Sequence, residues 1–119
     1  MATFGLVLDC VDPVKLADFW AEALGYRKVA AEGNYVVLLG AQAGHPKLLL
    51  QRVPEVKQTK NRMHLDIGVS AIEAEAARLE AIGARRSAAA PMTEHGTSWI
   101  LMADPEGNEF CVCDGGAPD

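Results

Sequence analysis

The sequence predicts an α+β fold built from two successive βαβββ modules. Two amphipathic helical patterns occur, and each is preceded by a short apolar stretch and followed by three β-like stretches separated by turn residues. A polar stretch without periodicity, residues 54–61, separates the two halves. A chain of 119 residues has the length of one domain. We therefore predict a single domain over 1–119, with module one at about 4–53, a linker at 54–61 and module two at about 62–114.

The first module opens with an apolar run, Gly5–Cys10, that has the length of a strand. Asp12 and Pro13 follow, and these are a favoured helix N-cap and a favoured first helical residue. The helix is expected to end at Gly25, because glycine readily adopts the left-handed conformation of a helix terminus. Its apolar face consists of Leu16, Phe19, Trp20, Ala23 and Leu24. Strands are expected near 26–31, 35–40 and 47–53.

The second module repeats this order, beginning with a strand over 62–69. Ser70 and Glu73 have the spacing of a capping box, which predicts a helix start, and Gly83 closes the helix. The apolar face of this helix is Ile72, Ala76, Leu79 and Ile82. Three further strands are expected near 84–88, 98–103 and 109–114. Side-chain identity between the two halves is nearly absent, so a ferredoxin-like α+β domain is the structural alternative.

Composition and charge indicate which kinds of molecule the protein binds. Eleven Lys and Arg against 16 Asp and Glu give a net charge of −5, which argues against a nucleic-acid partner and favours a small molecule. The three cysteines contain no CxxC pair, so neither a disulfide framework nor a zinc ribbon is expected. The first residues carry no basic region, and nowhere do 18 apolar residues run together. We therefore expect a cytoplasmic protein that does not contact membranes.

Three motifs together carry a family resemblance. They are Asp-Pro-x-x-Leu-Ala-x-Phe-Trp-x-x-x-Leu-Gly at 12–25, Lys-Asn-Arg-x-His-Leu-Asp at 60–66, and Asp-Pro-Glu-Gly-Asn at 104–108. With the repeated module, they resemble the vicinal oxygen chelate superfamily, which includes glyoxalase I, bleomycin-resistance proteins and extradiol dioxygenases. The chain is most similar to the small bacterial glyoxalase-like proteins. The resemblance implies that the modules form a half-barrel cup and that the chain forms a homodimer.

The resemblance also implies where a metal would bind. The family places one ligand on the first and last strand of each module, and these positions fall on Gly5, Gln51, His64 and Cys111 against a typical His/Glu/His/Glu set. Glycine has no donor, a glutamine amide is uncharged, and a thiolate does not suit an oxygen-rich catalytic metal. We therefore predict no cofactor. If a divalent metal binds, the expected ligands are His64 and Gln51, with Glu109 or Cys111.

Strand alternation places a set of polar side chains on the faces turned away from the helices. These are Asp9, Gln51, His64, Asp66, Glu109 and Cys111. So many ionisable groups on such faces indicate chemistry or polar recognition. A histidine beside carboxylates can move a proton at neutral pH, so His64, Asp66 and Glu109 are the predicted catalytic residues. The alternative is that His64 merely bonds a neighbouring carboxylate and that the acids are solvated.

Other residues are candidates for substrate contacts. The guanidinium of Arg62 matches a carboxylate or phosphate, although such a basic run is also typical of a solvated linker. Trp99 either supplies an apolar platform for a ligand or packs on a helix. Packing is favoured over nucleophilic chemistry for Cys111, and His95 is a candidate rim residue on a loop. The predicted substrate-binding set is Asp9, Gln51, Arg62, Trp99 and Cys111.

Two functions follow from these features. The first is a glyoxalase-like lyase or isomerase that acts on a small oxygenated metabolite. The second is a non-catalytic binding protein of the bleomycin-resistance kind, and an acidic cup would suit a cationic or polyhydroxylated guest. The cluster of acids favours the first, and the loss of charged donors at Gly5 and Gln51 favours the second. A structural dimer with no ligand is a third alternative.

Overall fold

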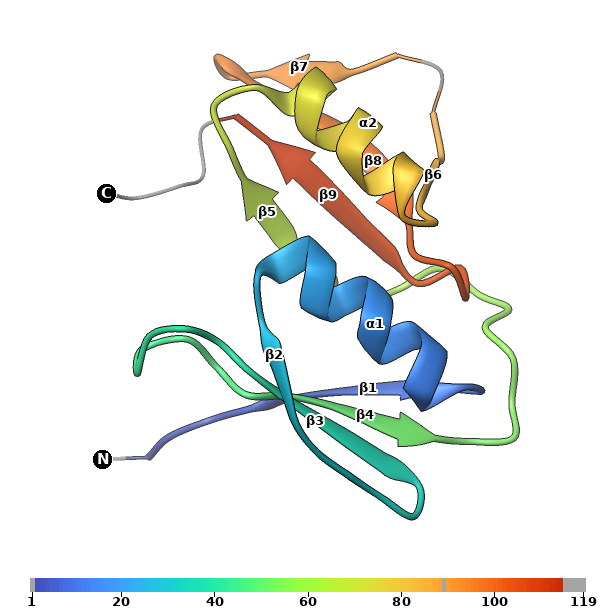
Figure 1. Ribbon diagram of the computed structural model, residues 1–119. Coiled ribbons are helices and arrows are strands. Elements are labelled where there is room, and N and C mark those ends of the chain that lie inside the picture. The colour runs from blue at the N-terminus through green and yellow to red at the C-terminus, as the bar shows by residue number, and fades with distance from the viewer. Residues whose placement is uncertain (1, 89, 115–119) are drawn as a thin grey trace. The chain divides into compact units, whose positions relative to one another are not determined.

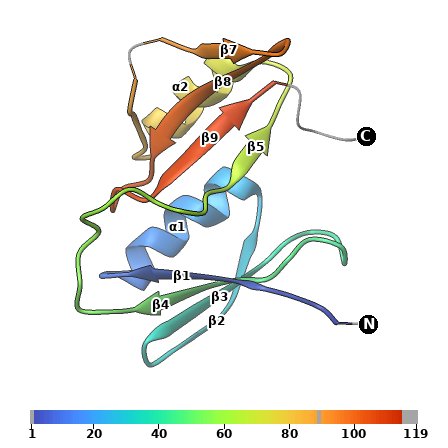
Figure 2. The same ribbon diagram turned by 180° about the vertical axis from the view of Figure 1, so that it is seen from behind.

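Two helices and two β-sheets form the computed structural model, which describes residues 2–88 and 90–114 (Figure 1). The chain divides into two compact units, unit 1 (Met1–Lys57) and unit 2 (Gln58–Asp119). Each unit has one helix packed on one face of its own sheet (Figure 2). Two separate sheets distinguish this fold from the ferredoxin-like alternative, and the predicted α+β class is confirmed.

Unit 1 has the predicted βαβββ order. Its elements are β1 (Leu6–Cys10), α1 (Pro13–Leu24), β2 (Arg27–Glu32), β3 (Tyr35–Leu39) and β4 (Leu48–Arg52). The strands lie in the order β1-β4-β3-β2, with β1 parallel to β4 and the other pairs antiparallel. Each of the four predicted strands and the helix is therefore confirmed to within about a residue or two, the usual spread in element boundaries.

Local sequence signals determine both ends of α1. The Asp12 carboxylate accepts a hydrogen bond from the Lys15 backbone N–H at 3.2 Å, and Pro13 is the first helical residue, as predicted. Gly25 closes the helix in the left-handed conformation, with φ of 69°. The side chains that α1 buries are Pro13, Leu16, Ala17, Phe19, Trp20 and Ala23.

The core of unit 1 lies between α1 and one face of the sheet. Alternate strand residues point towards the helix and are buried, namely Val36, Leu38, Leu48 and Leu50. Burying one such large apolar side chain contributes about 1.5–3 kcal/mol, so this layer is a main source of stability. The residues between them in sequence face the opposite side of the sheet, which α1 does not cover.

Unit 2 has the same order with one additional strand. Its elements are β5 (Asp66–Gly68), α2 (Ile72–Ala81), β6 (Arg85–Arg86), β7 (Met92–Glu94), β8 (Thr97–Ala103) and β9 (Glu109–Cys113). The strand order is β5-β9-β8-β6, and β7 pairs with β8. The predicted strand over 62–69 is shorter than expected, because pairing with β9 begins only at Asp66. His64 therefore precedes the strand.

The start of α2 differs from the prediction. Ala71 is the N-cap, and no side chain caps the helix, so the capping box predicted at Ser70 and Glu73 is wrong. Ser70 stands one residue before the cap position, out of register for the reciprocal bonds of that motif. Glu73 and Glu75 in the first turn still favour the helix, because negative charge complements the N-terminal end of its dipole.

The Asp-Pro-Glu-Gly-Asn motif forms the turn between β8 and β9. Asp104 is fully buried, and its carboxylate accepts hydrogen bonds from the backbone N–H groups of Glu106 and Asn108, both at 2.9 Å. The Asn108 side-chain amide donates to the other carboxylate oxygen at 2.9 Å. The motif is thus a turn held by one buried acceptor. Neither helix in the described part of the chain is long and apolar enough to cross a membrane.

Candidate functional site

His64 and Asp66 form a close pair at the start of β5. The His64 Nδ1 atom lies 3.2 Å from the Asp66 Oδ1 atom. Both side chains reach solvent, with exposed fractions of 37% and 60%. A longer contact of 3.5 Å joins Nδ1 to the Leu65 carbonyl oxygen. A histidine oriented by a carboxylate and open to solvent can exchange a proton with a bound molecule.

Cys111 lies next to this pair on the neighbouring strand β9. In the parallel pairing of β5 and β9, Asp66 lies opposite Cys111. One possible ligand atom from each of His64, Asp66 and Cys111 lies within 4.8 Å of the other two. Burial, followed by the negative charge of Asp66, raises the pKa of the Cys111 thiol. The thiol is therefore protonated near neutral pH, which agrees with packing rather than nucleophilic chemistry.

Glu109 is held by the segment that leads to His64. Its Oε1 atom accepts a hydrogen bond from the Asn61 backbone N–H at 2.6 Å, and its Oε2 atom lies 3.4 Å from the Lys60 ammonium. The Glu109 backbone N–H donates in return to the Asn61 side chain at 3.4 Å. Sequence reasoning selected Glu109 but missed Asn61 as an anchor. The only available signal was the Lys-Asn pair within the 60–66 motif.

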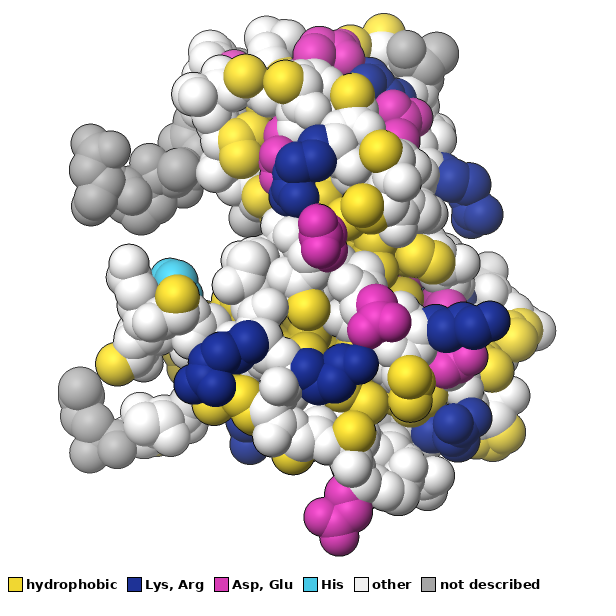
Figure 3. Space-filling view, in the orientation of Figure 1, with side chains coloured by type: hydrophobic (Ala, Val, Ile, Leu, Met, Phe, Trp, Pro, Cys, Tyr) yellow, Lys and Arg dark blue, Asp and Glu magenta, His cyan; other side chains and the backbone are white. Residues whose placement is uncertain are grey.

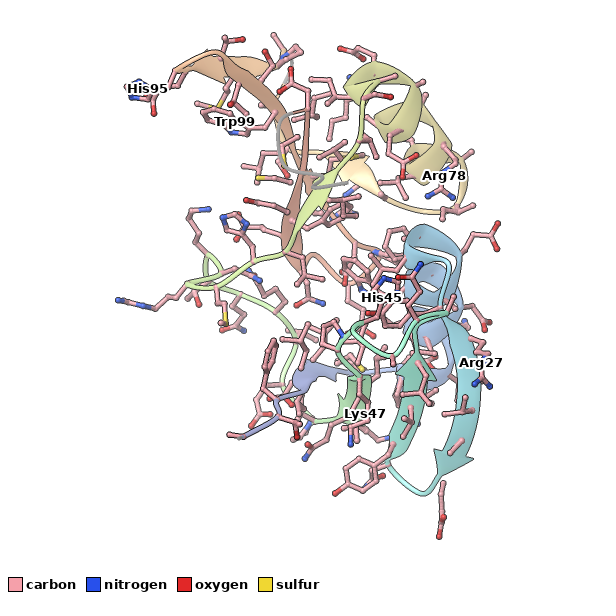
Figure 4. The ribbon with its side chains drawn as sticks, turned by 90° about the vertical axis from the view of Figure 1, so that its left-hand side faces the viewer. Arg27, His45, Lys47, Arg78, His95 and Trp99 are labelled. Carbon is pink, nitrogen blue, oxygen red and sulfur yellow. The ribbon has the colours of Figure 1, made fainter. Side chains whose placement is uncertain are left out.

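Strand register determines which face Trp99 occupies, a point that the sequence left open. Trp99 lies opposite Cys113, and Leu101 lies opposite Cys111, so all four share the face of the sheet turned away from α2. Trp99 is half-buried on this face. Figure 4 shows His95 farther out on the β7–β8 hairpin than Trp99.

The other predicted contact residues are described within their own units. Arg62 is exposed in the segment before β5. Asp9 and Gln51 belong to unit 1, where they lie opposite each other on β1 and β4. Tyr35 lies opposite Gln51 on β3, on the same face. The structure therefore brings Asp9 together with Gln51, and His64 together with Asp66 and Cys111.

The residues at the family's metal positions do not fit its usual ligand set. Gly5 supplies no donor, and a side-chain Cβ built there would lie 3.6 Å from the Lys47 Cε atom, so a lysine stem occupies the adjacent space. Gln51 carries no charge, and both carboxylate oxygens of Glu109 already have partners in unit 2. Gly5, Gln51 and Glu109 therefore do not supply the usual charged donors, whereas His64, Asp66 and Cys111 each offer one possible ligand atom.

Comparisons with known proteins agree with the fold. A sequence profile for the glyoxalase-like domain matches residues 5–113. The fold is similar to that of a glyoxalase-related enzyme from Fulvimarina pelagi, with a TM-score of 0.74, 20% identity, and coverage of 97% of this chain and 89% of that one. It is also similar to the fosfomycin resistance protein FosX from Listeria monocytogenes, with a TM-score of 0.77, 14% identity, and coverage of 97% and 93%.

A third similar structure is a glyoxalase/bleomycin resistance protein/dioxygenase family enzyme from Burkholderia phytofirmans PsJN. Its TM-score is 0.75 at 16% identity, with coverage of 92% of this chain and 94% of that one. No curated protein matches the sequence significantly. At these identities the solved structures establish the fold alone, whereas the domain profile spans nearly all of the sequence. The chain therefore belongs to the glyoxalase-like domain family, within the vicinal oxygen chelate superfamily.

Proposed function

We propose that this protein binds a small oxygenated metabolite beside His64 and transfers a proton at a carbon next to a carbonyl group, as a lyase or isomerase does. The observation that carries the proposal is the 3.2 Å contact between His64 Nδ1 and Asp66 Oδ1, with both side chains open to solvent. Such a pair has the geometry of a base and its orienting carboxylate.

The proposed mechanism assigns a separate task to each ring nitrogen of His64. The Asp66 carboxylate favours a proton on Nδ1, which leaves the Nε2 lone pair to accept a proton from the substrate. Asp66 then stabilises the imidazolium that forms. The proton returns from Nε2 either to the opposite face of the same carbon, which completes an epimerisation, or to a leaving hydroxyl oxygen, which completes an elimination with release of water. In both cases neutral His64 is regenerated.

The remaining residues have supporting roles in this proposal. Glu109 positions the segment that carries His64, because both of its oxygens contact residues of that segment. Arg62 is proposed to pair with an acidic group of the substrate, and Trp99 to contact its apolar part. Cys111 is proposed to line the site as a neutral thiol. Asp9 and Gln51 remain proposed substrate contacts on unit 1.

Hydrogen–deuterium exchange tests proton transfer directly. Small hydroxyketones, hydroxyaldehydes and 2-oxo acids would be incubated with the protein in D2O, and loss of the proton next to the carbonyl followed by NMR. We expect exchange with at least one compound, a loss of about 100-fold or more in His64→Ala, and a smaller loss in Asp66→Asn. His45→Ala is the matched control, since this histidine stacks on Tyr26 and has no proposed role in the site. Equal exchange by wild type and His64→Ala would contradict the proposal.

A second candidate function is ligand binding without turnover. It is favoured by Gly5 and Gln51, which supply no charged donor at two positions where metal-using relatives carry ligands. A compound that raises the melting temperature but shows no exchange at any carbon would support this function. Metal analysis of protein purified without chelators belongs to the same experiment, and activity that disappears with EDTA would contradict the metal-independent mechanism.

We also propose that the chain works as a homodimer in the cytoplasm. In the part of the chain that the structure describes, Cys10, Cys111 and Cys113 form no disulfide, which is typical of a reducing compartment. Light scattering after size-exclusion chromatography would measure the mass in solution, and a monomer at micromolar concentration would contradict the dimer.

A further inference from the structure

Strand β2 forms one edge of the unit 1 sheet. The strands lie in the order β1-β4-β3-β2, so β2 pairs with β3 on one side, and no strand in the described part of the chain pairs with its other side. All six of its residues, Arg27–Glu32, are exposed. An edge strand presents a row of backbone N–H and C=O groups to which a further strand can pair.

The two ends of β2 carry opposite charges. Arg27 is its first residue and Glu32 is its last, and residues 29–31 between them are small or apolar. Lys28 already forms an ion pair with Asp18 of α1, at 3.0 Å. Among the residues that the structure describes, neither Arg27 nor Glu32 has an ion-pair partner. One free positive charge and one free negative charge therefore mark the ends of the exposed edge.

A β-bulge places these two charges on the same face of the sheet. The pairing with β3 shifts its register after Lys28. Arg27 lies opposite Leu39, and Glu32 lies opposite Tyr35. Leu39 and Tyr35 are four residues apart on a regular strand, so they point to the same face. Arg27 and Glu32 are five residues apart, and only the extra residue of the bulge brings their side chains to one face.

This arrangement makes β2 complementary to a second copy of itself. In a two-fold interface, if Arg27 of one copy lies opposite Glu32 of the other, the reverse pair forms as well. Residues directly opposite each other on paired strands share a face, and the bulge meets this condition for both pairs. Residues 28–31 then contain a single charge, that of Lys28, so no like charges lie opposite each other.

The surface of unit 1 favours contact by strand pairing over burial of a large apolar patch. Over this unit, Figure 3 shows basic and acidic side chains interspersed with hydrophobic ones. Figure 4 shows the Arg27 side chain beside β2, the edge strand. An unrelated extended peptide would gain the same backbone hydrogen bonds. A second copy of this chain, however, forms two charge pairs at once, because the symmetry repeats each contact.

We propose that two copies of this protein associate by antiparallel pairing of their β2 strands, which joins two four-stranded sheets into one. The inference rests on the homodimer proposed above and names its contact surface. Arg27 of each copy pairs with Glu32 of the other. The contact uses the backbone edge of β2. The backbone groups supply the hydrogen-bonded ladder, and the exposed charges determine its register and direction.

Charge reversal tests this register on the full chain by analytical ultracentrifugation over a range of concentrations. Arg27→Glu alone would place negative charges opposite each other, and Glu32→Arg alone would place positive charges opposite each other. Each variant should weaken self-association about tenfold or more, since two attractive pairs become repulsive. The double variant, Arg27→Glu with Glu32→Arg, should associate as wild type does, because both pairs are restored in reversed order.

A mixture of the two single variants tests the two-fold symmetry. One variant has acidic residues at both ends of β2, and the other has basic residues at both ends. The mixture should therefore associate at least as strongly as wild type, although each variant alone does not. Arg85→Glu is the matched control, because it reverses the same charge on an exposed position of β6 in unit 2 and should leave self-association unchanged.

The inference is overturned if both single variants associate as wild type does, or if the double variant and the mixture associate no better than the single variants. Unchanged association of the single variants would leave a homodimer with a different contact, whereas a monomeric wild type at micromolar concentration would contradict both proposals. The measured mass does not depend on proton transfer at His64, so that proposal is tested separately. Amide signal dispersion would confirm that each variant is folded.

Discussion

The Glu109 carboxylate accepts a hydrogen bond of 2.6 Å from the backbone N–H of Asn61, a residue 48 positions earlier in the chain. The Asn61 side chain accepts from the Glu109 N–H in return and also donates to the Met63 carbonyl at 3.1 Å. The first residue of β9 thus fixes the segment that ends at His64. Glu109 contacts the backbone that carries the proposed base, whereas Asp66 contacts the base itself.

Substitutions at Glu109 test this positioning role. Glu109→Ala should lower the free energy of unfolding by about 1–2 kcal/mol, because it leaves a partly buried N–H without its acceptor. Glu109→Gln should lose less, since an amide oxygen can still accept that bond. Urea denaturation measures both values, and hydrogen exchange at the Asn61 amide reports the local effect. Glu94→Ala, on the exposed strand β7, is the control. An equal loss of stability in Glu109→Gln and Glu109→Ala would argue against a specific hydrogen bond to the Asn61 N–H.

The buried turn residue Asp104 is expected to be a major determinant of unit 2 stability. Asp104→Ala removes the acceptor for two backbone N–H groups and the Asn108 amide, and should lower the free energy of unfolding by about 2–4 kcal/mol. Asp104→Asn should lie between wild type and alanine, because one oxygen remains. Thermal or urea unfolding measures the series. A loss below about 0.5 kcal/mol in the alanine variant would show that the turn forms without its acceptor.

The thiols of Cys111 and Cys113 should react slowly near neutral pH. Burial, and then the charge of Asp66, raises the pKa of each, so the unreactive protonated form predominates. Iodoacetamide labelling, followed by mass spectrometry, should be slower than for free cysteine at pH 7 and faster at pH 9. Asp66→Asn should accelerate labelling of Cys111. Rapid labelling of wild type at pH 7 would contradict this order.

The same pKa shifts predict that the protein becomes less stable at alkaline pH. Well below pH 8.5, the ordinary pKa of a cysteine, both thiols are protonated in the folded and unfolded states. As the pH rises further, the unfolded chain ionises first, so the free energy of unfolding should fall. Replacing both cysteines by alanine should remove this part of the pH dependence between pH 8 and 10. An unchanged slope in that variant would assign the effect to other groups.

Two glycines offer a matched test of backbone conformation. Gly25 has φ of 69°, and Gly44 has no positive φ, while a Cβ at either position would meet no atom within 4 Å. Gly25→Ala should cost about 1 kcal/mol through strain alone. Gly44→Ala should be neutral or stabilising by up to about 0.5 kcal/mol, because it restricts the unfolded chain. Urea denaturation compares them, and equal effects would contradict the assignment.

Helix α1 shows what local sequence can predict. Asp12, Pro13 and Gly25 act on neighbouring backbone groups, so their effect does not depend on distant parts of the chain, and both ends of the helix were predicted correctly. Strand β7 shows the opposite case. Met92–Glu94 is short, exposed and without an apolar pattern, and it is a strand because β8 supplies its hydrogen-bonding partners.

The sequence by itself determined the βαβββ order of unit 1 and the buried face of α1, because apolar periodicity and helix caps depend on residues a few positions apart, and its motifs carried the family resemblance. Only the tertiary structure decided that Asp66 lies opposite Cys111, that Glu109 holds Asn61, and that Lys47 lies against Gly5. Each of these contacts joins residues more than 40 positions apart. They depend on strand register, which is determined by packing and pairing across the sheet rather than by local preference.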